Sequence, residues 1–309
     1  MLTNLISELA QLLIGQTPTL KLSDIPSKIY KDDKAILDIS KLVLDNGDEW
    51  DFNRKVYLCA YNLEKYTLDL LKRENSLTVT QSINKLVKTT NGKKFVSFMN
   101  GPFFNMTNGI GIGRKKINGV TFNTLFTDYL EPWENNTTPM NMRGFGFKDN
   151  VGTLFIKNPS ELLPTSFDDA KMYFEGTPLI IDKKNSINNF VENGATELLN
   201  SNTLQTSRTV FGKSFERNTM GLPFIGISSS NNINYLISIT LEDKITAGLP
   251  TLTEVFNTLF LVTKVINIEK LIYTDGSDSL YLKYGTEVKH KMYDSKNKNM
   301  PFYFGIRKI

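Results

Sequence analysis

The chain of 309 residues is 40% hydrophobic, which suffices for one large core or for a core with a small appendage. Its 36 Lys and Arg residues are interleaved with 32 Asp and Glu along the chain, which leaves a net charge of +4. The basic residues are therefore not gathered in one stripe, and this argues against nucleic-acid binding. The single cysteine, Cys59, excludes an internal disulfide and predicts a buried thiol, and the single histidine, His290, excludes a multi-histidine metal centre. Any chemistry therefore uses carboxylates, Arg, Asn, Tyr, Lys or a metal bound by oxygens, without an organic cofactor.

Residues 1–50 are predicted to form a small helical segment for attachment or oligomerisation. One helical face carries four apolar side chains, Leu2, Ile6, Leu9 and Leu13. This pattern predicts an amphipathic helix that packs on a partner or on itself, and residues 23–29 predict a short capped helix after it. The segment is similar to N-terminal pieces of phage tail and fibre proteins, which implies a virion or cell-surface location, with homo-oligomer or virion partners. We expect neither a secretory signal peptide nor a membrane span, because a basic n-region, a cleavage pattern and a run of ~20 apolar residues are all missing.

From Trp50 onward the pattern changes to strands with interspersed helices. The expected elements are a hairpin of strands 55–61 and 67–71, a helix over 80–87 capped by Thr80, a long loop over 132–141, a helix over 252–265, a strand over 266–273 and a closing strand over 301–309. This order predicts an α+β domain over 51–309 with a mixed, largely antiparallel sheet and packed helices.

The first polar motif follows an apolar strand, at Asn100-Gly101-Pro102-Phe103-Phe104-Asn105. Glycine permits a sharp turn and proline fixes it. Amides beside aromatic rings suit a sugar, whose hydroxyls bind amides and whose C–H faces pack on rings. The alternative is a hydrophobic turn that places Phe103 or Phe104 in the core.

Two further segments carry charge. Thr206-Ser207-Arg208-Thr209-Val210-Phe211-Gly212 places an arginine between hydroxyls in a strand-like run, which suits phosphate or carboxylate oxygens, although such an Arg is also typical of a solvated edge or an ion pair. Thr274-Asp275-Gly276-Ser277-Asp278-Ser279 joins apolar flanks and presents two carboxylates on a short tip. The alternative for this second segment is an Asp-Gly turn that closes a hairpin.

In order and in wording, these segments resemble the phosphodiester glycosidase family, which includes the enzyme that uncovers mannose 6-phosphate. The resemblance covers roughly residues 52 to 309. It extends to a Gly-x-Pro-Leu strand at Gly176-Thr177-Pro178-Leu179-Ile180-Ile181 and to a helix motif at 247–255 that contains Glu254. The sequence departs from the family where Gly276-Ser277-Asp278-Ser279 replaces Gly-Gly-Gly-Ser and where Pro102 replaces a glycine.

The resemblance implies hydrolysis of a sugar-1-phosphodiester in a surface glycan such as a capsule or teichoic acid. It assigns the phosphate oxygens to Arg208, orientation of sugar or phosphate to Asn100 and Asn105, and acid/base or metal-binding chemistry to Asp275. Asp278 would join Asp275 in a Ca²⁺ or Mg²⁺ site, because hard cations take oxygen ligands. The remaining expected substrate contacts are Gly101, Phe103, Phe104, Ser207, Thr209, Gly276, Ser277 and Ser279.

Two other functions stay open at this point. Asp278 adds a negative charge that repels phosphate unless a cation neutralises it, and Pro102 removes a backbone donor. These departures favour a glycan-binding module on a degenerate enzyme fold. A structural role in a phage tail or fibre is the second alternative, and it would depend on residues 1–50.

Overall fold

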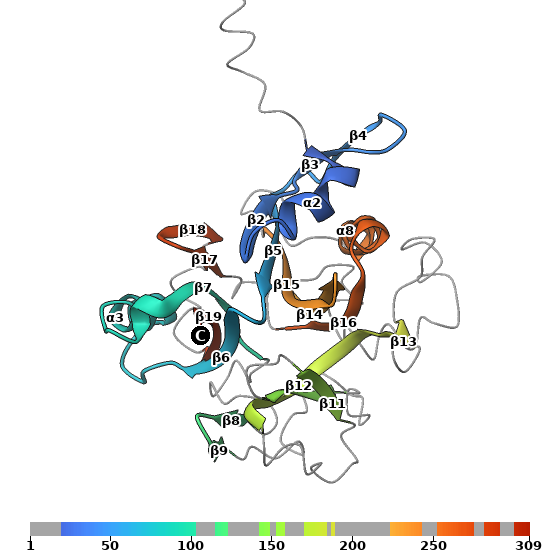
Figure 1. Ribbon diagram of the computed structural model, residues 1–309. Helices are drawn as coiled ribbons and strands as arrows, with labels where there is room; N and C mark the ends of the chain where they lie inside the picture. Colours follow the sequence, from blue (N-terminus) through green and yellow to red (C-terminus); the bar gives the residue numbers. More distant parts are fainter. Residues whose placement is uncertain are drawn as a thin grey trace, which may run out of the picture.

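A computed structural model shows a protein built mainly from β-strands (Figure 1). The structure describes residues 20–102, 115–122, 142–148, 153–157, 170–183, 187–188, 223–242, 252–274, 281–290 and 300–309. Within these ranges, all strand pairs are antiparallel except β1 with β3.

The largest sheet has eleven strands. Its main path runs in the order β11 (Thr153–Lys157), β10 (Met142–Lys148), β12 (Ala170–Asp182), β16 (Ile268–Tyr273), β14 (Phe224–Ser230), β15 (Ile233–Leu241), β5 (Val56–Asn62) and β2 (Lys34–Asp38). Two short strands pair with β12, namely β13 (Ile187–Asn188) and β8 (Lys115–Ile117), and β8 also pairs with β9 (Val120–Phe122).

A second sheet of five strands lies beside it, in the order β18 (Glu287–His290), β17 (Leu282–Tyr284), β7 (Phe95–Asn100), β19 (Phe302–Lys308) and β6 (Tyr66–Lys72). A small third sheet contains β1 (Leu20–Lys21), β3 (Lys41–Val43) and β4 (Glu49–Asp51). The helices are η1 (Leu22–Asp24), α2 (Ile25–Ile29), α3 (Val79–Leu86), η2 (Gly92–Lys94) and α8 (Leu252–Val265).

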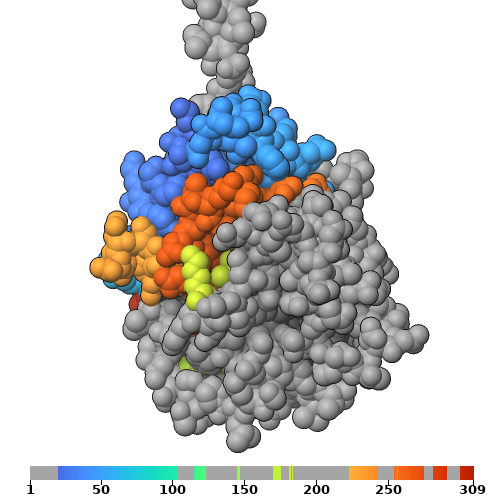
Figure 2. Space-filling view, turned by 90° about the vertical axis from the view of Figure 1, so that its right-hand side faces the viewer, coloured from blue at the N-terminus to red at the C-terminus, as the bar shows by residue number. Residues whose placement is uncertain are grey.

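The hydrophobic cores follow from this layering. The central core takes side chains from both large sheets, including Cys59, Leu68, Met99, Phe174, Ile225, Ile272, Leu282 and Phe304. On the outer face of the eleven-stranded sheet, α2 and α8 pack over Leu58, Ile237 and Ile239. Figure 2 shows α8 in orange against the blue N-terminal residues. On the outer face of the five-stranded sheet, α3 packs through Val79 and Ile83 against Phe98 and Tyr303.

The strand β5 shows why the sequence forms this arrangement. All seven of its residues are buried, and they alternate between two cores. Leu58 and Ala60 belong to the outer core, whereas Tyr57, Cys59 and Tyr61 belong to the central one. The predicted burial of the Cys59 thiol is confirmed, and burial raises its pKa to about 11. Such a thiol stays protonated and unreactive at neutral pH.

The predicted α+β class with packed helices and a helical N-terminal segment is wrong. The short helix expected over 23–29 exists as η1 and α2, but most of 20–51 consists of short strands, and strands dominate the rest of the described chain. These N-terminal strands have two to five residues and no clear apolar period, so their pairing is decided by tertiary contacts such as those of β2 with β5. The helix predicted over Leu2 to Leu13 lies outside the described residues.

The predicted hairpin of 55–61 and 67–71 is also wrong in its pairing. Both strands exist as β5 and β6, but β5 pairs with β15 and β2, whereas β6 pairs with β19 in the other sheet. The chain crosses between the sheets at Leu63, whose N–H donates to the carbonyl of Asn234 at 2.9 Å. The helix predicted over 80–87 is present as α3, with a capping box of Thr78 and Gln81 in place of the expected cap at Thr80.

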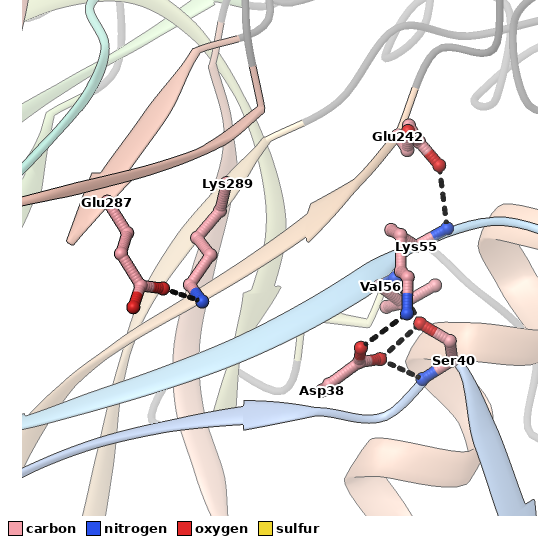
Figure 3. Close-up of polar contacts among 7 residues, drawn as sticks. All are labelled: Asp38, Ser40, Lys55, Val56, Glu242, Glu287 and Lys289. Atoms are coloured by element: carbon pink, nitrogen blue, oxygen red, sulfur yellow. Dashed lines mark hydrogen bonds and ion pairs between the residues drawn. The ribbon is translucent and has the colours of Figure 1, made fainter.

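A polar cluster fixes β2 to the rest of the eleven-stranded sheet (Figure 3). The Asp38 carboxylate accepts hydrogen bonds from the Ser40 N–H at 3.0 Å, from the Ser40 hydroxyl and from the Lys55 ammonium at 2.8 Å. Partial burial acts to raise the pKa of Asp38, but these hydrogen bonds lower it. The Lys55 N–H donates to Glu242 at 3.0 Å, so β2, β5 and the end of β15 are joined. The predicted domain boundary near residue 50 stays a prediction.

His290 connects the two large sheets. It ends β18, its Nε2 lies 3.1 Å from the Thr240 hydroxyl on β15, and its ring meets that of Tyr57 edge-on at 5.1 Å. The residue is buried, and its Nδ1 has no hydrogen-bond partner among the residues that the structure describes. Burial lowers the pKa of His290 from 6.5 to about 4, so the imidazole is neutral at pH 7.

This burial predicts a pH-dependent stability. Between about pH 6.5 and pH 4 the unfolded chain binds a proton that folded His290 excludes, so stability should fall as the pH decreases through this window. The shift corresponds to a loss on the order of 3 kcal/mol. Urea unfolding from pH 8 to pH 4 should give a shallower slope for His290→Gln, which retains a polar group near Thr240 but cannot titrate. Equal slopes for parent and variant would contradict the prediction.

Candidate functional site

The first polar motif begins where β7 ends. Asn100 is fully buried, and its side-chain Oδ1 accepts a hydrogen bond from the backbone N–H of Tyr281 at 2.6 Å. Tyr281 directly precedes β17, which pairs with β7 through Leu282 and Met99. The amide of Asn100 therefore holds Tyr281, the second residue after the acidic motif, against the start of the first motif.

Gly101 lies in a space that admits no side chain. A Cβ at this position would approach the Phe302 carbonyl oxygen to 2.4 Å and the Tyr303 nitrogen to 3.0 Å. Both neighbours are backbone atoms of β19 that cannot move aside easily. The glycine of this motif is thus explained by the close approach of two backbones, since its φ lies outside the left-handed region.

The acidic motif begins where β16 ends, at Thr274. Thr274 is fully buried, and both its N–H and its hydroxyl donate to the Pro223 carbonyl, at 3.0 and 3.1 Å. Pro223 directly precedes β14. Phe224, which follows it, stands opposite Tyr273, which precedes Thr274, and the two rings lie 5.6 Å apart. The end of β16 is therefore fixed to the start of β14, the first described strand after the arginine motif.

The two ends of the acidic motif belong to different sheets. β16 pairs with β12 and β14 in the eleven-stranded sheet, whereas β17 pairs with β7 and β18 in the five-stranded sheet. Residues 275–280 therefore connect two sheets, and the alternative of an Asp-Gly turn closing a hairpin between these strands is wrong. The segment after Gly101 makes a similar crossing, because it leads from β7 to β8 in the eleven-stranded sheet.

The expected Gly-x-Pro-Leu strand is confirmed as part of β12. Thr177 and Pro178 pair with β10, and Leu179 pairs with Ile272 of β16, so β12 changes partner within this motif. Ile272 lies two residues before Thr274. The strand motif, the end of β16 and the start of β14 are therefore neighbours at one end of the eleven-stranded sheet.

Most of the predicted site residues lie outside the described residues. Of those with expected roles, the structure places Asn100 and Gly101. The others are Phe103, Phe104, Asn105, Ser207, Arg208, Thr209, Asp275, Gly276, Ser277, Asp278 and Ser279. Their roles stay predictions, and the structure contributes the positions of the residues that flank three of the four motifs.

Two tyrosines anchor the five-stranded end of this region. Tyr281 and Tyr303 are buried in the core beneath α3, and burial raises the pKa of each to about 12. For Tyr303, the neighbouring Tyr281 raises it further. Both phenols are therefore neutral at ordinary pH, and the Tyr281 side chain fixes the residue whose N–H reaches Asn100.

The helix motif of the sequence has a structural role. Glu254 in α8 forms an ion pair with Arg54, whose Nε and Nη2 lie 3.1 and 3.0 Å from the Glu254 Oε1. The Nη1 of Arg54 also donates to the Glu242 carbonyl at 2.7 Å. The Arg54 side chain is only 4% exposed. Sequence reasoning did not predict this pair, because its partners are 200 residues apart. The forked geometry favours fixed packing of α8 on the sheet.

The β8–β9 hairpin was also missed. It turns at Asn118 and Gly119, which have φ values of 49° and 81°. An Asn-Gly pair is the strongest short-range hairpin signal, and it was present in the sequence. The hairpin brings Lys115 to the central core, beside Phe302.

No protein-family model matches the sequence, and no curated protein matches it. Among solved structures, the chain is similar to the catalytic domain of zebrafish N-acetylglucosamine-1-phosphodiester alpha-N-acetylglucosaminidase, auto-inhibited by its pro-peptide. That likeness has 14% identity and a TM-score of 0.52, and it covers 89% of this chain and 83% of that one. A hypothetical protein from Synechocystis gives 12% identity and a TM-score of 0.48, over 89% of this chain and 61% of that one.

At this identity, the zebrafish comparison establishes a related fold. It agrees with the resemblance indicated by the order of the sequence motifs. In the described ranges, no helix is long and apolar enough to cross a membrane, and no group of three or more His, Cys, Asp or Glu side chains is arranged to hold a metal ion.

The Asn100–Tyr281 contact gives a direct test of this geometry. Asn100→Ala leaves a buried backbone N–H without its acceptor, which should cost about 1–3 kcal/mol of stability by urea unfolding. The matched control is Ser97→Ala on the same strand, which removes a hydrogen bond of 2.8 Å to the Lys283 carbonyl, farther from the motifs. Ligand binding or turnover, per folded molecule, should fall in Asn100→Ala only. An equal effect of both variants on function would contradict a specific role for Asn100.

Proposed function

We propose that the protein hydrolyses a sugar-1-phosphodiester, releasing the free sugar and a phosphomonoester. The order of four sequence motifs and the fold related to that of the zebrafish phosphodiester glycosidase domain support this proposal. The observation that carries it is the hydrogen bond from the Tyr281 N–H to Asn100, which ties the first motif to the second residue after the acidic motif.

In this proposal, each charged group has a separate task. Arg208 holds the non-bridging oxygens of the phosphate through its planar fork. Asp275 provides the acid or base for water attack, while Asn105 and Asn100 orient the sugar or phosphate. The rings of Phe103 and Phe104 pack on the sugar face. Hydrogen bonds to the substrate come from Gly101, Ser207, Thr209, Gly276, Ser277 and Ser279.

The proposed substrates are phosphate-linked surface glycans, such as capsules or teichoic acids. Attachment through residues 1–50 to a virion or to further copies of the chain belongs to the same proposal. The second candidate is glycan binding without turnover, which is favoured by Pro102 and Asp278 in place of family glycines. Retention of a glycan without release of product would select this candidate.

The enzymatic proposal is tested with a panel of sugar-1-phosphodiesters, starting with N-acetylglucosamine-1-phosphodiesters, by measuring free sugar and phosphomonoester together. Arg208→Ala should lower kcat/KM about tenfold to more than a hundredfold, because charge-assisted hydrogen bonds contribute roughly 1.5–3 kcal/mol. Arg208→Lys should recover part of the activity.

A matched control is Arg307→Lys, which keeps a cation beside Asp69 between β19 and β6. Arg307 and Asp69 lie at the opposite end of β19 from Phe302 and Tyr303, so the Arg307→Lys variant should be as active as the parent. If Arg208→Ala instead unfolds the protein and leaves the activity of the folded fraction unchanged, Arg208 is a structural residue.

A divalent cation is proposed between Asp275 and Asp278. Two carboxylates three residues apart repel each other unless a positive charge lies between them. Ca²⁺ or Mg²⁺ should therefore raise the melting temperature, and Asp275→Asn should reduce the rise. Asp45→Asn, which changes an exposed carboxylate in the turn before β4, should leave the rise in melting temperature unchanged. The metal is rejected if Ca²⁺, Mg²⁺ and Mn²⁺ all leave the melting temperature of the parent unchanged.

A further inference from the structure

The strand β2 forms one edge of the eleven-stranded sheet (Figure 1). Among the residues that the structure describes, β2 pairs with β5 alone, and the register has no bulge. Its three central residues, Ala35, Ile36 and Leu37, are apolar and partly exposed. An edge strand presents a row of backbone donors and acceptors that another strand can use. The outer side of β2 is therefore a candidate surface for the addition of a strand from a second chain.

The hydrogen bonds between β2 and β5 show which backbone groups face outward. At one end the Asn62 N–H donates to the Asp33 carbonyl at 2.7 Å, and at the other the Ile39 N–H donates to the Val56 carbonyl at 2.9 Å. In an antiparallel pair, the backbone groups of alternate residues point to the same side. The odd-numbered residues from 33 to 39 therefore bond to β5. The residues whose N–H and C=O groups face away from β5 are Lys34, Ile36 and Asp38.

The side chains of β2 are divided between the two faces of the sheet. Ile36 packs on the central core, whereas Ala35 and Leu37 pack on the outer core, together with α2. The ammonium of Lys34 lies 5.7 Å from the centre of the Tyr284 ring, which belongs to the five-stranded sheet. A strand added to β2 would thus extend both apolar layers.

We propose that β2 pairs with β2 of a second copy of this chain, antiparallel and centred on Ile36, to form a two-fold symmetric dimer. In this register Lys34 of one copy stands opposite Asp38 of the other, and Ala35 stands opposite Leu37. All outward-facing N–H and C=O groups of the two strands then find partners. The contact uses the same patch on both copies, as a two-fold interface requires.

The charges at the two ends of β2 favour this register. Lys34 and Asp38 lie two residues on either side of Ile36, so self-pairing brings opposite charges together at both ends of the contact. The Asp38 Oδ2 binds the Lys55 ammonium at 2.8 Å, and a carboxylate has lone-pair sites for a further cation. Sliding one strand by two residues would place a charged side chain opposite Ile36 and lose both pairs. Sliding it by one would turn the outward backbone groups out of register.

The proposed contact is small. Five residues from each copy place it at the low end of specific interfaces, so we expect a dimer that dissociates on dilution. The inference deepens the proposed function, because it gives the attachment of residues 1–50 to further copies a defined surface. It does not depend on the hydrolytic activity.

The dimer is tested by sedimentation equilibrium of the full chain over an about hundredfold range of concentration. Ile36→Pro removes the central outward N–H without removing a donor to β5, and proline is tolerated on the outer side of an edge strand. This variant should be monomeric at every concentration. The matched control Ile36→Val keeps the N–H and a β-branched side chain, so its dissociation constant should lie within twofold of that of the parent.

A charge exchange tests the register. Lys34→Glu and Asp38→Lys should each weaken the dimer about tenfold or more, because both end pairs become repulsive. An equimolar mixture of the two variants should form a mixed dimer with nearly the parent affinity, since each pair again joins opposite charges. Lys31→Glu makes the same change of charge on an exposed residue before β2 and should alter the affinity less than twofold. If either Asp38→Lys or Ile36→Pro does not fold, Lys34→Glu decides the question.

Two results would overturn the inference. A parent that is monomeric at every concentration would leave β2 for a strand of another protein. A dimer that Ile36→Pro and Lys34→Glu leave unchanged would use another surface. Hydrolysis is measured separately, so the two proposals fail independently. A parent that dimerises through β2 but hydrolyses no sugar-1-phosphodiester keeps this interface and loses the proposed activity, whereas an active monomer does the reverse.

Discussion

The apolar core between the two large sheets is the constraint on which the rest of the structure depends. It is filled from both sides, by residues such as Cys59 and Ile272 on one sheet and Met99 and Phe304 on the other. Three pairs of successive strands, β5 and β6, β7 and β8, and β16 and β17, lie in different sheets, so the chain crosses between the sheets at these points. The segments after β5, β7 and β16 make these crossings, and two of them contain the first polar motif and the acidic motif. The candidate site is thus located where the shared core ends and the chain changes sheet.

Strand ends at such crossings leave backbone groups without a ladder partner, and buried groups of this kind must find other acceptors. Buried side chains and neighbouring strand termini supply them here. Asn100 accepts from Tyr281, and the N–H and hydroxyl of Thr274 both reach the carbonyl of Pro223. These contacts fix the flanks of the acidic motif on both sheets. The described residues on either side of the acidic motif are therefore fixed in two different sheets.

The same region places a buried lysine at the end of the apolar core. Lys115 enters from a hairpin of the eleven-stranded sheet and contacts an aromatic ring of the five-stranded sheet. A rigid backbone contact at Gly101 brings that aromatic residue next to the first motif. By contrast, Glu254 of the α8 motif forms a partly buried ion pair with Arg54, which stabilises the packing of that helix. The Arg54 charge thus has a structural role at α8.

The sequence alone determined the local elements with strong signals. These include α8, the strand before Asn100, the closing strand β19 and the burial of Cys59. The order of the motifs also indicated the related fold. Only the tertiary structure decided which strands pair, because β5 and β6 look like a hairpin in sequence but bury their faces in different sheets. The tertiary structure also showed that the strands on either side of the acidic motif lie in different sheets and do not form a hairpin. It revealed the Arg54–Glu254 pair as well. Pairing and burial depend on partners up to 200 residues away, and local periodicity carries no information about them.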